Sequence, residues 1–353
     1  MEDCGVIVDK IKKKLHTWAT RHLSYAGRLQ LIHTVLLGLR NYWMNIFVLP
    51  QSVIKEIEKH CRLFLWGQSG NRCKVHFGSW EKVCRPKHLG GLGFMEGTKW
   101  NMATLAKFLW AIMEKHDVLW VKWVNVVYMK GDDIWNYKLG VDTSWYWKKL
   151  CHLRKDFKQQ QIMAAGRNGK FMASFLYNNM VSCEEDQYCK AVWNRYNIPK
   201  HRFILWQTVH TQLLTRDQLA IFHISILSSD CPVCGLEAET HQHLFFDCCF
   251  SKQVVYEIFS WLGFQAWNLQ FTSWRTFLSI TDSRFKDKVV VMLLAAVVYY
   301  IWLNRNKCTH DNSSYTIGHI VKEIKRIVKY RLYSYRQRRI DSNSQGLMCM
   351  LLT

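Results

Sequence analysis

Four residues with the chemistry of metal ligands lie close together in this chain, in the pattern C-x2-C-x8-H-x4-C. They are Cys231, Cys234, His243 and Cys248. Structural zinc sites take four Cys or His ligands in a tetrahedron, and a C-x2-C turn supplies two thiolates at once. Pro232 and Gly235 stand in or just after that turn, where a sharp reversal of the chain needs them. The array predicts a small zinc-stabilised module with Zn2+ as its cofactor.

Two neighbouring residues leave the ligand set open. His241 could replace His243, and Cys249 could replace Cys248. We prefer His243 and Cys248 because an x4 spacing is common in zinc knuckles.

Structural zinc can contribute on the order of 10 kcal/mol to local folding, so metal binding alone does not imply nucleic-acid contact. The nearby aromatic residues could stack on bases, but a core-filling role is favoured because so small a module has little else to pack. These residues are Trp206, Phe245, Phe246 and Phe250.

The composition points to a folded protein with an acidic partner. The 353 residues include 49% hydrophobic and 14% aromatic side chains, which is unlike a disordered chain and enough for two or three domains. The formal net charge is +21. A charge of this size favours RNA or DNA as the partner, with an anionic membrane surface second.

The cysteines and the apolar segments bear on the compartment. The 13 cysteines are scattered and follow a charged N-terminus without a secretory pattern. We therefore expect reduced thiols in the nucleus or cytoplasm, and not secretion. The most apolar segment is 289–303, which is shorter than the roughly 20 residues a bilayer needs, so a buried helix is predicted there and no membrane span.

Apolar spacing predicts a mainly α fold. Leu29, Ile32, Val35 and Leu36 recur at helical steps, and 52–66 resumes the pattern after Pro50, which suggests two antiparallel helices. The glycine-rich stretch that follows is expected to be a connection with little regular structure. Further helices are predicted over 101–129, 189–196, 201–212, 250–262, 286–303 and 320–335. The pattern over 131–170 is weak.

The last predicted helix is strongly basic. Four of its cations are spaced by three or four residues and share one face, while Ile320, Ile324 and Val328 belong to another. Such a face can release counterions from a nucleic-acid backbone. A solvated surface or a membrane-surface helix are the alternatives. The predicted nucleic-acid-binding residues are Lys322, Lys325, Arg326, Lys329, Arg336, Arg338 and Arg339.

Several segments resemble plant LINE-type (non-LTR) retrotransposon reverse transcriptases. The stretch 23–28, reading Leu-Ser-Tyr-Ala-Gly-Arg, with Leu49-Pro50 and Phe64-Leu65-Trp66-Gly67, looks like the thumb-like segment that follows the polymerase palm. The stretch 86–93, reading Pro-Lys-His-Leu-Gly-Gly-Leu-Gly, resembles a Gly-rich connection, and Ser144 to Leu150 resembles a Trp-rich motif.

The closest resemblance is to the zinc-binding region of the same family. It is carried by Gly169-Lys170-Phe171, Leu205-Trp206, Leu214-Thr215-Arg216-Asp217 and the array itself, with Ile301-Trp302 and Arg305-Asn306 further on. The resemblance implies a thumb-like helical segment over 1–70, a Gly/Trp-rich connector with a helix over 71–170, and a zinc-binding domain over 171–262. A helical C-terminal region with a basic tail would fill 263–353.

One motif of these polymerases is missing. Their Tyr/Phe-x-Asp-Asp carboxylates hold the two catalytic metal ions, and no such motif occurs here. Asp132-Asp133 reads as a polar turn. We therefore expect a fragment that lacks the palm, is not an enzyme, and binds RNA or DNA with little sequence preference. The alternatives are a zinc-stabilised structural or protein-interaction module, or a non-functional relict of a transposable element. The sequence does not indicate an oligomeric state.

Overall fold

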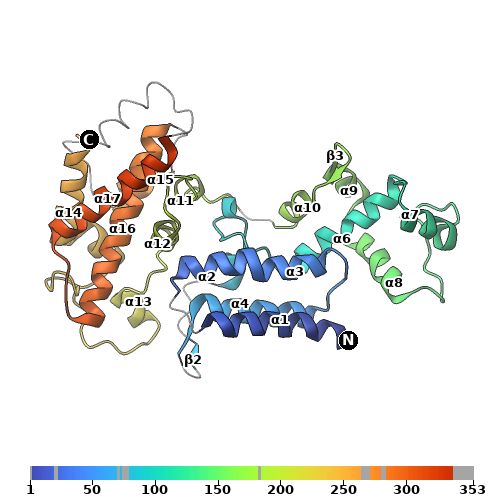
Figure 1. Ribbon diagram of the computed structural model, residues 1–353, viewed down its shortest axis with the longest axis horizontal. Coiled ribbons are helices and arrows are strands. Elements are labelled where there is room, and N and C mark those ends of the chain that lie inside the picture. Colours follow the sequence, from blue (N-terminus) through green and yellow to red (C-terminus); the bar gives the residue numbers. More distant parts are fainter. Residues whose placement is uncertain are drawn as a thin grey trace. The chain divides into compact units, whose positions relative to one another are not determined.

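The protein is mainly helical, as predicted. The computed structural model describes residues 2–19, 23–69, 72–73, 79–181, 184–263, 271–279 and 284–336. Contacts divide the chain into two compact units, which are described separately below (Figure 1). Unit 1 comprises 1–23 and 27–184, and unit 2 comprises 24–26 and 185–353. The described strands have two residues each and form two antiparallel hairpins: β1 (Gln68–Ser69) with β2 (Arg72–Cys73), and β3 (Gly166–Arg167) with β4 (Lys170–Phe171).

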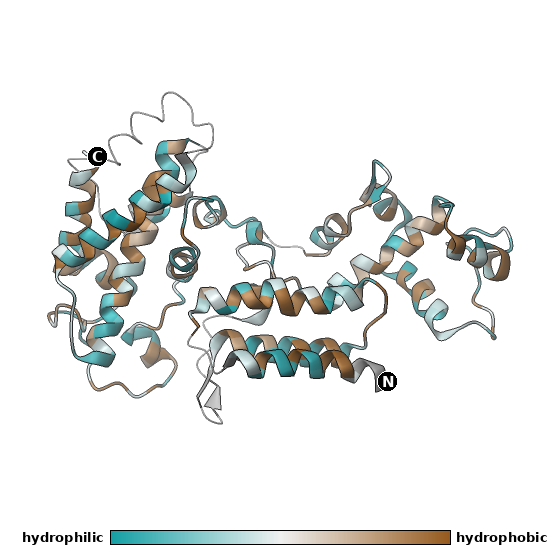
Figure 2. Ribbon diagram, in the orientation of Figure 1, coloured by the Kyte–Doolittle hydropathy of each residue, from teal (hydrophilic) through white to brown (hydrophobic). Residues whose placement is uncertain are grey.

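Unit 1 begins with amphipathic helices. α1 (Glu2–Ala19) packs on α4 (Gln51–Trp66). Buried side chains on the two helices, such as Ile11 and Ile57, recur at helical spacing, and Figure 2 shows alternating hydrophilic and hydrophobic bands along the pair. The chain between α1 and α4 forms one continuous helical segment that is antiparallel to α4, so the predicted antiparallel pair is confirmed. This helical segment consists of α2 (Tyr25–Leu31), the π-helical turn η1 (Ile32–Leu36) and α3 (Leu37–Met44).

The glycine-rich connection is more ordered than the sequence predicted. It contains α5 (Trp80–Cys84) and the 3-10 turn η2 (Lys87–Leu89). The chain then folds back on α5, because the Leu92 N–H donates to the Val83 carbonyl at 3.0 Å and the Gly93 N–H donates to the Arg85 carbonyl at 2.9 Å. The expectation of little regular structure was therefore wrong for 80–89.

A second core in unit 1 surrounds α6 (Gly97–Met113). Glu96 caps this helix by accepting hydrogen bonds from the Thr98 and Lys99 N–H groups. Apolar side chains of α6, including Leu105 and Leu109, pack with those of the following helices. These are α7 (Leu119–Val124), the π-helical turn η3 (Asn125–Met129), α8 (Trp145–His152), the 3-10 turn η4 (Leu153–Lys155), α9 (Gln159–Ala165) and α10 (Ala173–Met180).

One prediction in this region fails. The single helix expected over 101–129 ends at Met113, and the chain turns at Lys115, whose φ is +49°. No Gly or Pro marks this break, so the apolar pattern concealed it. The weak stretch 131–170 contains α8 and α9. The division of the chain into 1–70, 71–170, 171–262 and 263–353 stays a prediction. Contacts place α10, which belongs to the predicted zinc-binding domain, in unit 1.

Unit 2 holds the two longest helices of the described residues, α16 (Phe285–Asp311) and α17 (Ile317–Arg336). Together with α14 (Cys249–Trp261), these helices confirm three predicted helices to within a few residues, apart from the C-terminal end of α16, which extends eight residues beyond the predicted 303. α16 contacts α12, α14 and α17 (Figure 1). The helix predicted over 189–196 is one turn that ends at Val192. The remaining helices are α11 (Cys189–Val192), α12 (Pro199–Val209), α13 (Arg216–Ile221), the π-helical turn η5 (His243–Asp247) and α15 (Phe271–Ser279).

α16 is the core helix of unit 2. It extends further than the predicted 286–303, and by length and composition it is the one described helix that could cross a membrane. The helix is therefore longer than the roughly 20 residues that a bilayer needs, and the predicted length was wrong. In the structure 72% of its apolar window is buried inside the protein, so the predicted buried helix is confirmed.

Candidate metal centre and basic surface

The first half of the metal array is a tight knuckle. An isolated β-bridge joins Asp230 to Ala238, and the Cys231 N–H donates to the Glu237 carbonyl at 2.6 Å. Within this small loop the Gly235 N–H donates back to the Cys231 carbonyl at 2.7 Å. Gly235 has φ +69°, a conformation in which side chains with a Cβ are strained. This backbone holds the Cys231 and Cys234 thiols on the same side of the turn.

The second half of the array comes from a wide helical turn. His243 opens η5, and the Cys248 N–H donates to the His243 carbonyl at 2.7 Å. This bond spans five residues, as in a π-helix. Cys248 is also the residue before α14, and the Ser251 hydroxyl donates to the Leu244 carbonyl at 2.6 Å to fasten the junction. The x4 spacing therefore turns both ligand side chains toward the knuckle.

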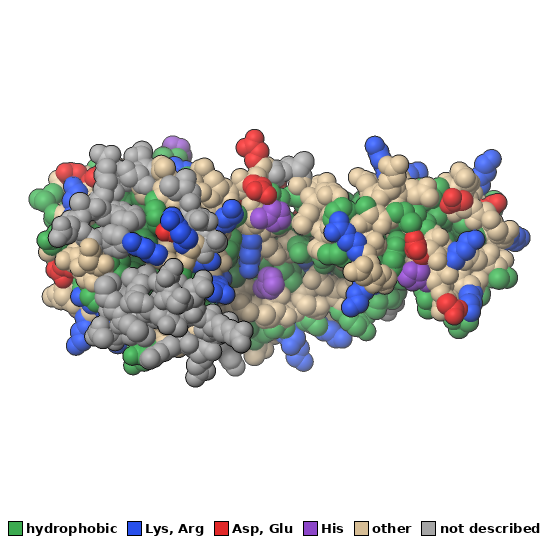
Figure 3. Space-filling model, turned by 90° about the horizontal axis from the view of Figure 1, so that it is seen from above, with side chains coloured by type: hydrophobic (Ala, Val, Ile, Leu, Met, Phe, Trp, Pro, Cys, Tyr) green, Lys and Arg blue, Asp and Glu red, His purple; other side chains and the backbone are tan. Residues whose placement is uncertain are grey.

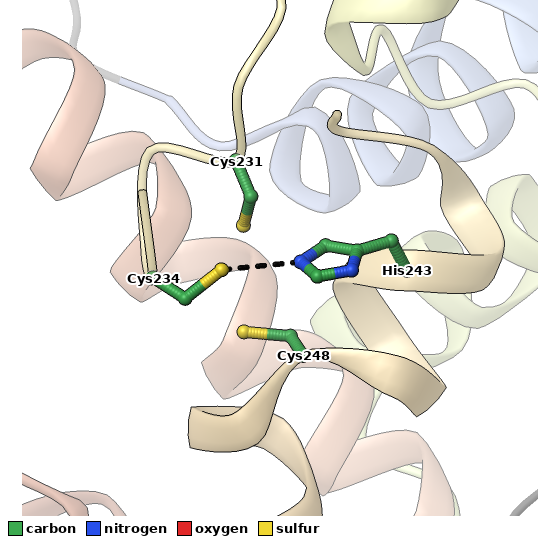
Figure 4. Close-up of side chains that lie close together, drawn as sticks. All are labelled: Cys231, Cys234, His243 and Cys248. Carbon is green, nitrogen blue, oxygen red and sulfur yellow. Dashed lines mark hydrogen bonds between the residues drawn. The ribbon is translucent and has the colours of Figure 1, made fainter. Parts of the chain in front are cut away.

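The four predicted ligand atoms meet in the structure. The Sγ atoms of the three cysteines and one ring nitrogen of His243 all lie within 4.8 Å of one another (Figure 4). Cys234 Sγ lies 3.2 Å from His243 Nε2. With Zn–S near 2.3 Å and Zn–N near 2.0 Å, a zinc tetrahedron holds its ligand atoms about 3.5 to 3.8 Å apart. The donor set and its spacing fit a closed structural zinc site.

Hydrogen bonds in the cluster favour a thiolate at Cys231. The pKa of the Cys231 thiol lies below its ordinary value, chiefly because the Cys248 thiol donates a hydrogen bond to its sulfur. Burial raises this pKa, whereas the N–H groups of Cys234 and Val233 lower it further. The same bond raises the pKa of Cys248. Thiolates are the form of cysteine that binds zinc, so Cys231 is prepared to accept a cation.

Glu237 was not foreseen and orients the histidine ligand. Its carboxylate lies 2.9 Å from His243 Nδ1, which leaves Nε2 facing the sulfurs. The Glu237 side chain is 70% exposed, whereas that of His243 is 7% exposed. A carboxylate on the far nitrogen of a ligating histidine is a common second contact in zinc sites and selects the tautomer. Its position six residues before His243 carried no pattern that would have identified it.

The two alternative ligands lie outside the cluster. His241 is buried and points toward the Thr215 hydroxyl, with Nδ1 3.1 Å from Oγ1. Cys249 is exposed at the start of α14. The geometry thus favours His243 and Cys248 over these neighbours.

A buried polar network attaches the module to α16. The Glu239 carboxylate accepts two hydrogen bonds from Arg305, at 2.6 and 2.7 Å, and a third from the Arg216 N–H at 2.9 Å. Thr215 also donates to Asp217. Arg216 and Arg305 belong to motifs, 214–217 and 305–306, to which the sequence pattern assigned no role. Through Glu239, both residues fix the knuckle against the core helix of unit 2.

Three of the four aromatic residues named around the array fill the core, as expected, whereas Phe250 is half-buried. Trp206, Phe245 and Phe246 are all buried. Phe246 packs against Trp274, with ring centroids 5.2 Å apart. Buried rings are closed to bases, so stacking by these three side chains is not supported.

The basic face of α17 is present but unevenly exposed. Ile320, Ile324 and Val328 are buried, which turns the predicted cations outward. Lys322 and Arg326 are exposed, while Lys325 and Lys329 are half-buried. The Arg336 side chain, Arg338 and Arg339 lie outside the described residues.

Two of these cations already have partners. The Arg326 guanidinium binds the Glu323 carboxylate through two hydrogen bonds, of 3.1 and 2.6 Å. The ammonium of Lys325 lies 5.3 Å from the centre of the Trp261 ring on α14. Exposed ion pairs are weak in water, so Arg326 can still exchange Glu323 for a phosphate.

Further cations that the sequence analysis did not connect with α17 lie beside it. Burial and the nearby Arg326 charge lower the pKa of Lys200, and burial and Arg331 lower the pKa of Arg202. Arg331 donates to the Arg195 carbonyl at 2.9 Å. The start of α12 and the face of α17 therefore form one basic surface, an arrangement that depends on folding and not on sequence spacing. On the face drawn in Figure 3, Lys and Arg side chains outnumber Asp and Glu among the described residues.

The acidic pair examined as a catalytic motif lies in a turn. Asp132 and Asp133 are exposed, and Asp133 accepts a hydrogen bond from the Trp135 N–H at 2.9 Å. Its carboxylate thus stabilises the turn, which agrees with the polar turn expected there.

Comparisons with known proteins support the reading of the metal region. Residues 171–254 match the family described as zinc-binding in reverse transcriptase. A stretch of 128 residues, 36% of this chain, is 33% identical to an Arabidopsis thaliana protein named "Putative ribonuclease H protein". Another Arabidopsis thaliana relative, named as an uncharacterized mitochondrial protein, is 27% identical over 115 residues, which are 32% of this chain and 75% of that protein.

These matches identify a reverse-transcriptase-related zinc-binding region, and they cover only part of the chain. The aligned stretch spans 21% of the first relative. The family match contains all four clustered donors and ends within α14.

Proposed function

We propose that this chain is a zinc-stabilised, nucleic-acid-binding part of a reverse-transcriptase-related protein. The observation that carries the proposal is the Cys3His cluster, which lies inside the segment that matches the zinc-binding family. The proposed ligands are Cys231, Cys234, His243 and Cys248. The LINE type and plant origin indicated by the motifs belong to the same proposal, as does a location in the nucleus or cytoplasm.

Zinc would act here as a structural ion. Four protein ligands leave no open position for a substrate, which distinguishes structural from catalytic zinc. The ion would tie the knuckle to the start of α14, and the Glu239–Arg305 pair would tie the knuckle to α16. We expect no polymerase activity, because the chain has no Tyr/Phe-x-Asp-Asp motif to hold catalytic metal ions.

Nucleic acid would bind on the basic surface formed by α17 and the start of α12. Lys322 and Arg326 are exposed there, and Lys200 lies close to Arg326. Lys322 and Arg326 are four residues apart on α17. Such cations contact the phosphate backbone without reading bases, so binding would tolerate any sequence.

Salt dependence tests this proposal directly. Lys322→Gln/Lys329→Gln in the full chain should weaken binding to a single-stranded RNA 20-mer and reduce the slope of log K against log salt by about 1.4, since each lost phosphate contact removes about 0.7. Lys190→Gln/Lys252→Gln, which removes two exposed charges elsewhere in unit 2, should leave the slope close to wild type. Equal effects of the two double variants would exclude α17 as the binding surface. Repeating the titration with DNA of the same sequence determines whether RNA is preferred.

A protein-interaction role is the second candidate. The part of unit 1 around α7 and η3 exposes large apolar side chains: Leu119 is 83% exposed, Trp123 53% and Val126 74%. These positions lie at steps of four and three residues on one side of the helix. A partner bound there would respond little to salt, which separates this role from phosphate binding.

A further inference from the structure

Unit 1 contains a pocket that the proposed function does not use. It lies among α1, α2 and α4, with a volume of about 530 Å3. Pockets of ordinary small-molecule ligands range from about 300 to 1,000 Å3, so its size suits one nucleotide. α1 contributes side chains at helical spacing, Lys12, Leu15 and His16, and α4 contributes Lys59, His60, Leu63 and Phe64.

One wall of the pocket is aromatic. Trp18 and Phe64 both line it, and their ring centroids are 6.0 Å apart with the planes tilted by 47°. Both side chains are only half-buried, so their rings are open to the pocket rather than closed into the core. Aromatic rings in this setting are platforms on which bases stack without regard to sequence.

The rest of the lining is cationic. Lys12 and Lys59 extend from α1 and α4, and Arg28 enters from α2, where its guanidinium lies 6.0 Å from the Phe64 ring centre. The Arg28 Nη1 also donates to the Phe64 carbonyl at 3.4 Å, which holds the guanidinium beside the aromatic wall. The described lining residues include no Asp or Glu. A concave site lined by one sign of charge concentrates ions of the opposite sign.

One carboxylate outside the lining steadies these cations without filling the pocket. Glu56 lies 4.0 Å from the Lys12 ammonium, 3.8 Å from that of Lys59 and 3.0 Å from His60 Nε2. The two lysine contacts are long and the lysine side chains are well exposed, so they hold the lysines weakly. Glu56 carries one negative charge against the two lysines, Lys12 and Lys59, so the described lysine pair keeps a net positive charge that favours an anion.

We propose that this pocket binds a nucleotide unit, with the base against Trp18 and Phe64 and the phosphate on Lys12, Arg28 and Lys59. The site lies wholly in unit 1 and is independent of the zinc module and of α17. The shared chemistry is an aromatic ring joined to a phosphate. Such a unit can come from a free nucleotide or from a single-stranded nucleic acid.

The test uses calorimetry on the full chain carrying Lys322→Gln/Lys329→Gln, so that binding through α17 is weakened in every protein compared. The probes are uridine 5′-monophosphate, hexauridylate and inorganic phosphate. The central comparison is Lys12→Gln against Lys13→Gln, because adjacent positions on α1 lose the same charge and only Lys12 lines the pocket. Trp18→Leu removes the stacking ring, and thermal unfolding of each variant shows that it remains folded.

The proposal expects uridine monophosphate or hexauridylate to bind. Trp18→Leu should weaken that binding about tenfold. Lys12→Gln should weaken it while Lys13→Gln leaves it unchanged. Tighter binding of hexauridylate assigns the site to a nucleic-acid strand, and equal binding assigns it to free nucleotides. Equal effects of the two lysine variants would overturn the proposal. So would inorganic phosphate that binds as tightly as the nucleotides, because the aromatic wall would then contribute nothing.

Discussion

Glu239 and Arg305 form a bidentate ion pair across 66 residues of sequence, with N–O distances of 2.6 and 2.7 Å. The side chains are 0% and 6% exposed. Glu239 stands between the knuckle and His243, whereas Arg305 belongs to α16. The pair therefore couples the metal module to the core helix of unit 2.

Breaking one side of this pair should be costly. Glu239→Gln leaves the Arg305 guanidinium buried without a countercharge, and we expect a loss of about 3–5 kcal/mol in the free energy of unfolding. The double variant Glu239→Gln/Arg305→Met should recover part of that loss, because it removes the stranded charge. Urea titrations of the full chain, followed by zinc release to a chromogenic chelator, measure both effects. A double variant as unstable as the sum of both single variants would show that the two residues act independently.

The ligand assignment makes a second prediction, with matched controls supplied by the chain. Cys248→Ser and His243→Gln should lose bound zinc, whereas Cys249→Ser and His241→Gln should retain one equivalent, since only the first pair belongs to the cluster. Metal content by mass spectrometry after dialysis against a weak chelator gives the stoichiometry. Retention of zinc by Cys248→Ser together with its loss from Cys249→Ser would reverse the assignment at the fourth ligand.

The Gly-rich turn of unit 1 makes a third prediction. A Cβ built on Gly91 would lie 2.0 Å from the Arg85 carbonyl oxygen, a backbone atom that cannot move aside cheaply. Gly91→Ala should therefore destabilise unit 1 by more than about 2 kcal/mol, as expected for overpacking against backbone. Gly38→Ala is the control: nothing lies within 4 Å of its Cβ position in α3, and alanine should stabilise the helix by about 0.5–1 kcal/mol. Thermal unfolding compares the two. A tolerated Gly91→Ala would mean that 85–93 adopts another path.

The sequence predicted what depends on short-range spacing. The apolar periodicity located α14 and α17 to within a few residues, and the C-x2-C-x8-H-x4-C pattern selected the four residues that the structure brings together. Both succeed because the responsible residues lie within a few turns of one another. The Ser144 side chain, which accepts a hydrogen bond from the Trp147 N–H, shows that α8 also carried a local cap that was overlooked.

What the sequence did not reveal depends on distant residues meeting. The Glu239–Arg305 pair, the approach of Lys200 to Arg326 and the pocket between α1 and α4 each join separate segments. In a single sequence, no rule of residue spacing links positions that are so far apart. The end of α6 at Met113 was missed for a different reason, because a helix can stop through backbone geometry alone, without Gly or Pro.

His201 makes the fourth prediction, which concerns pH. The side chain is fully buried in α12, its ring stacks on Tyr299 with centroids 4.5 Å apart, and neither ring nitrogen has a hydrogen-bond partner in the described structure. Burial, and then the charge of Lys200, lowers the pKa of His201 to about 3. In the unfolded chain the pKa of His201 is near 6.5. Below that pH the unfolded state binds a proton at this residue that the folded state does not bind. Stability should therefore fall with acidification, by about 1 kcal/mol between pH 6.5 and 5.5 from this residue.

The variant His201→Phe isolates this effect. Phenylalanine keeps the planar ring against Tyr299 and removes two buried nitrogen atoms without partners, so the variant should be more stable than wild type by about 1 kcal/mol even at neutral pH. Its advantage should grow as the pH falls from 6.5 to 5.5, because only wild type must keep a histidine neutral. Urea midpoints at both pH values give the difference in stability between the variant and wild type, and zinc content is checked at each pH. Acid effects on the metal ligands are common to both proteins and cancel in this difference. A constant difference would show that His201 titrates alike in the folded and unfolded chains, through water or a partner reaching its ring.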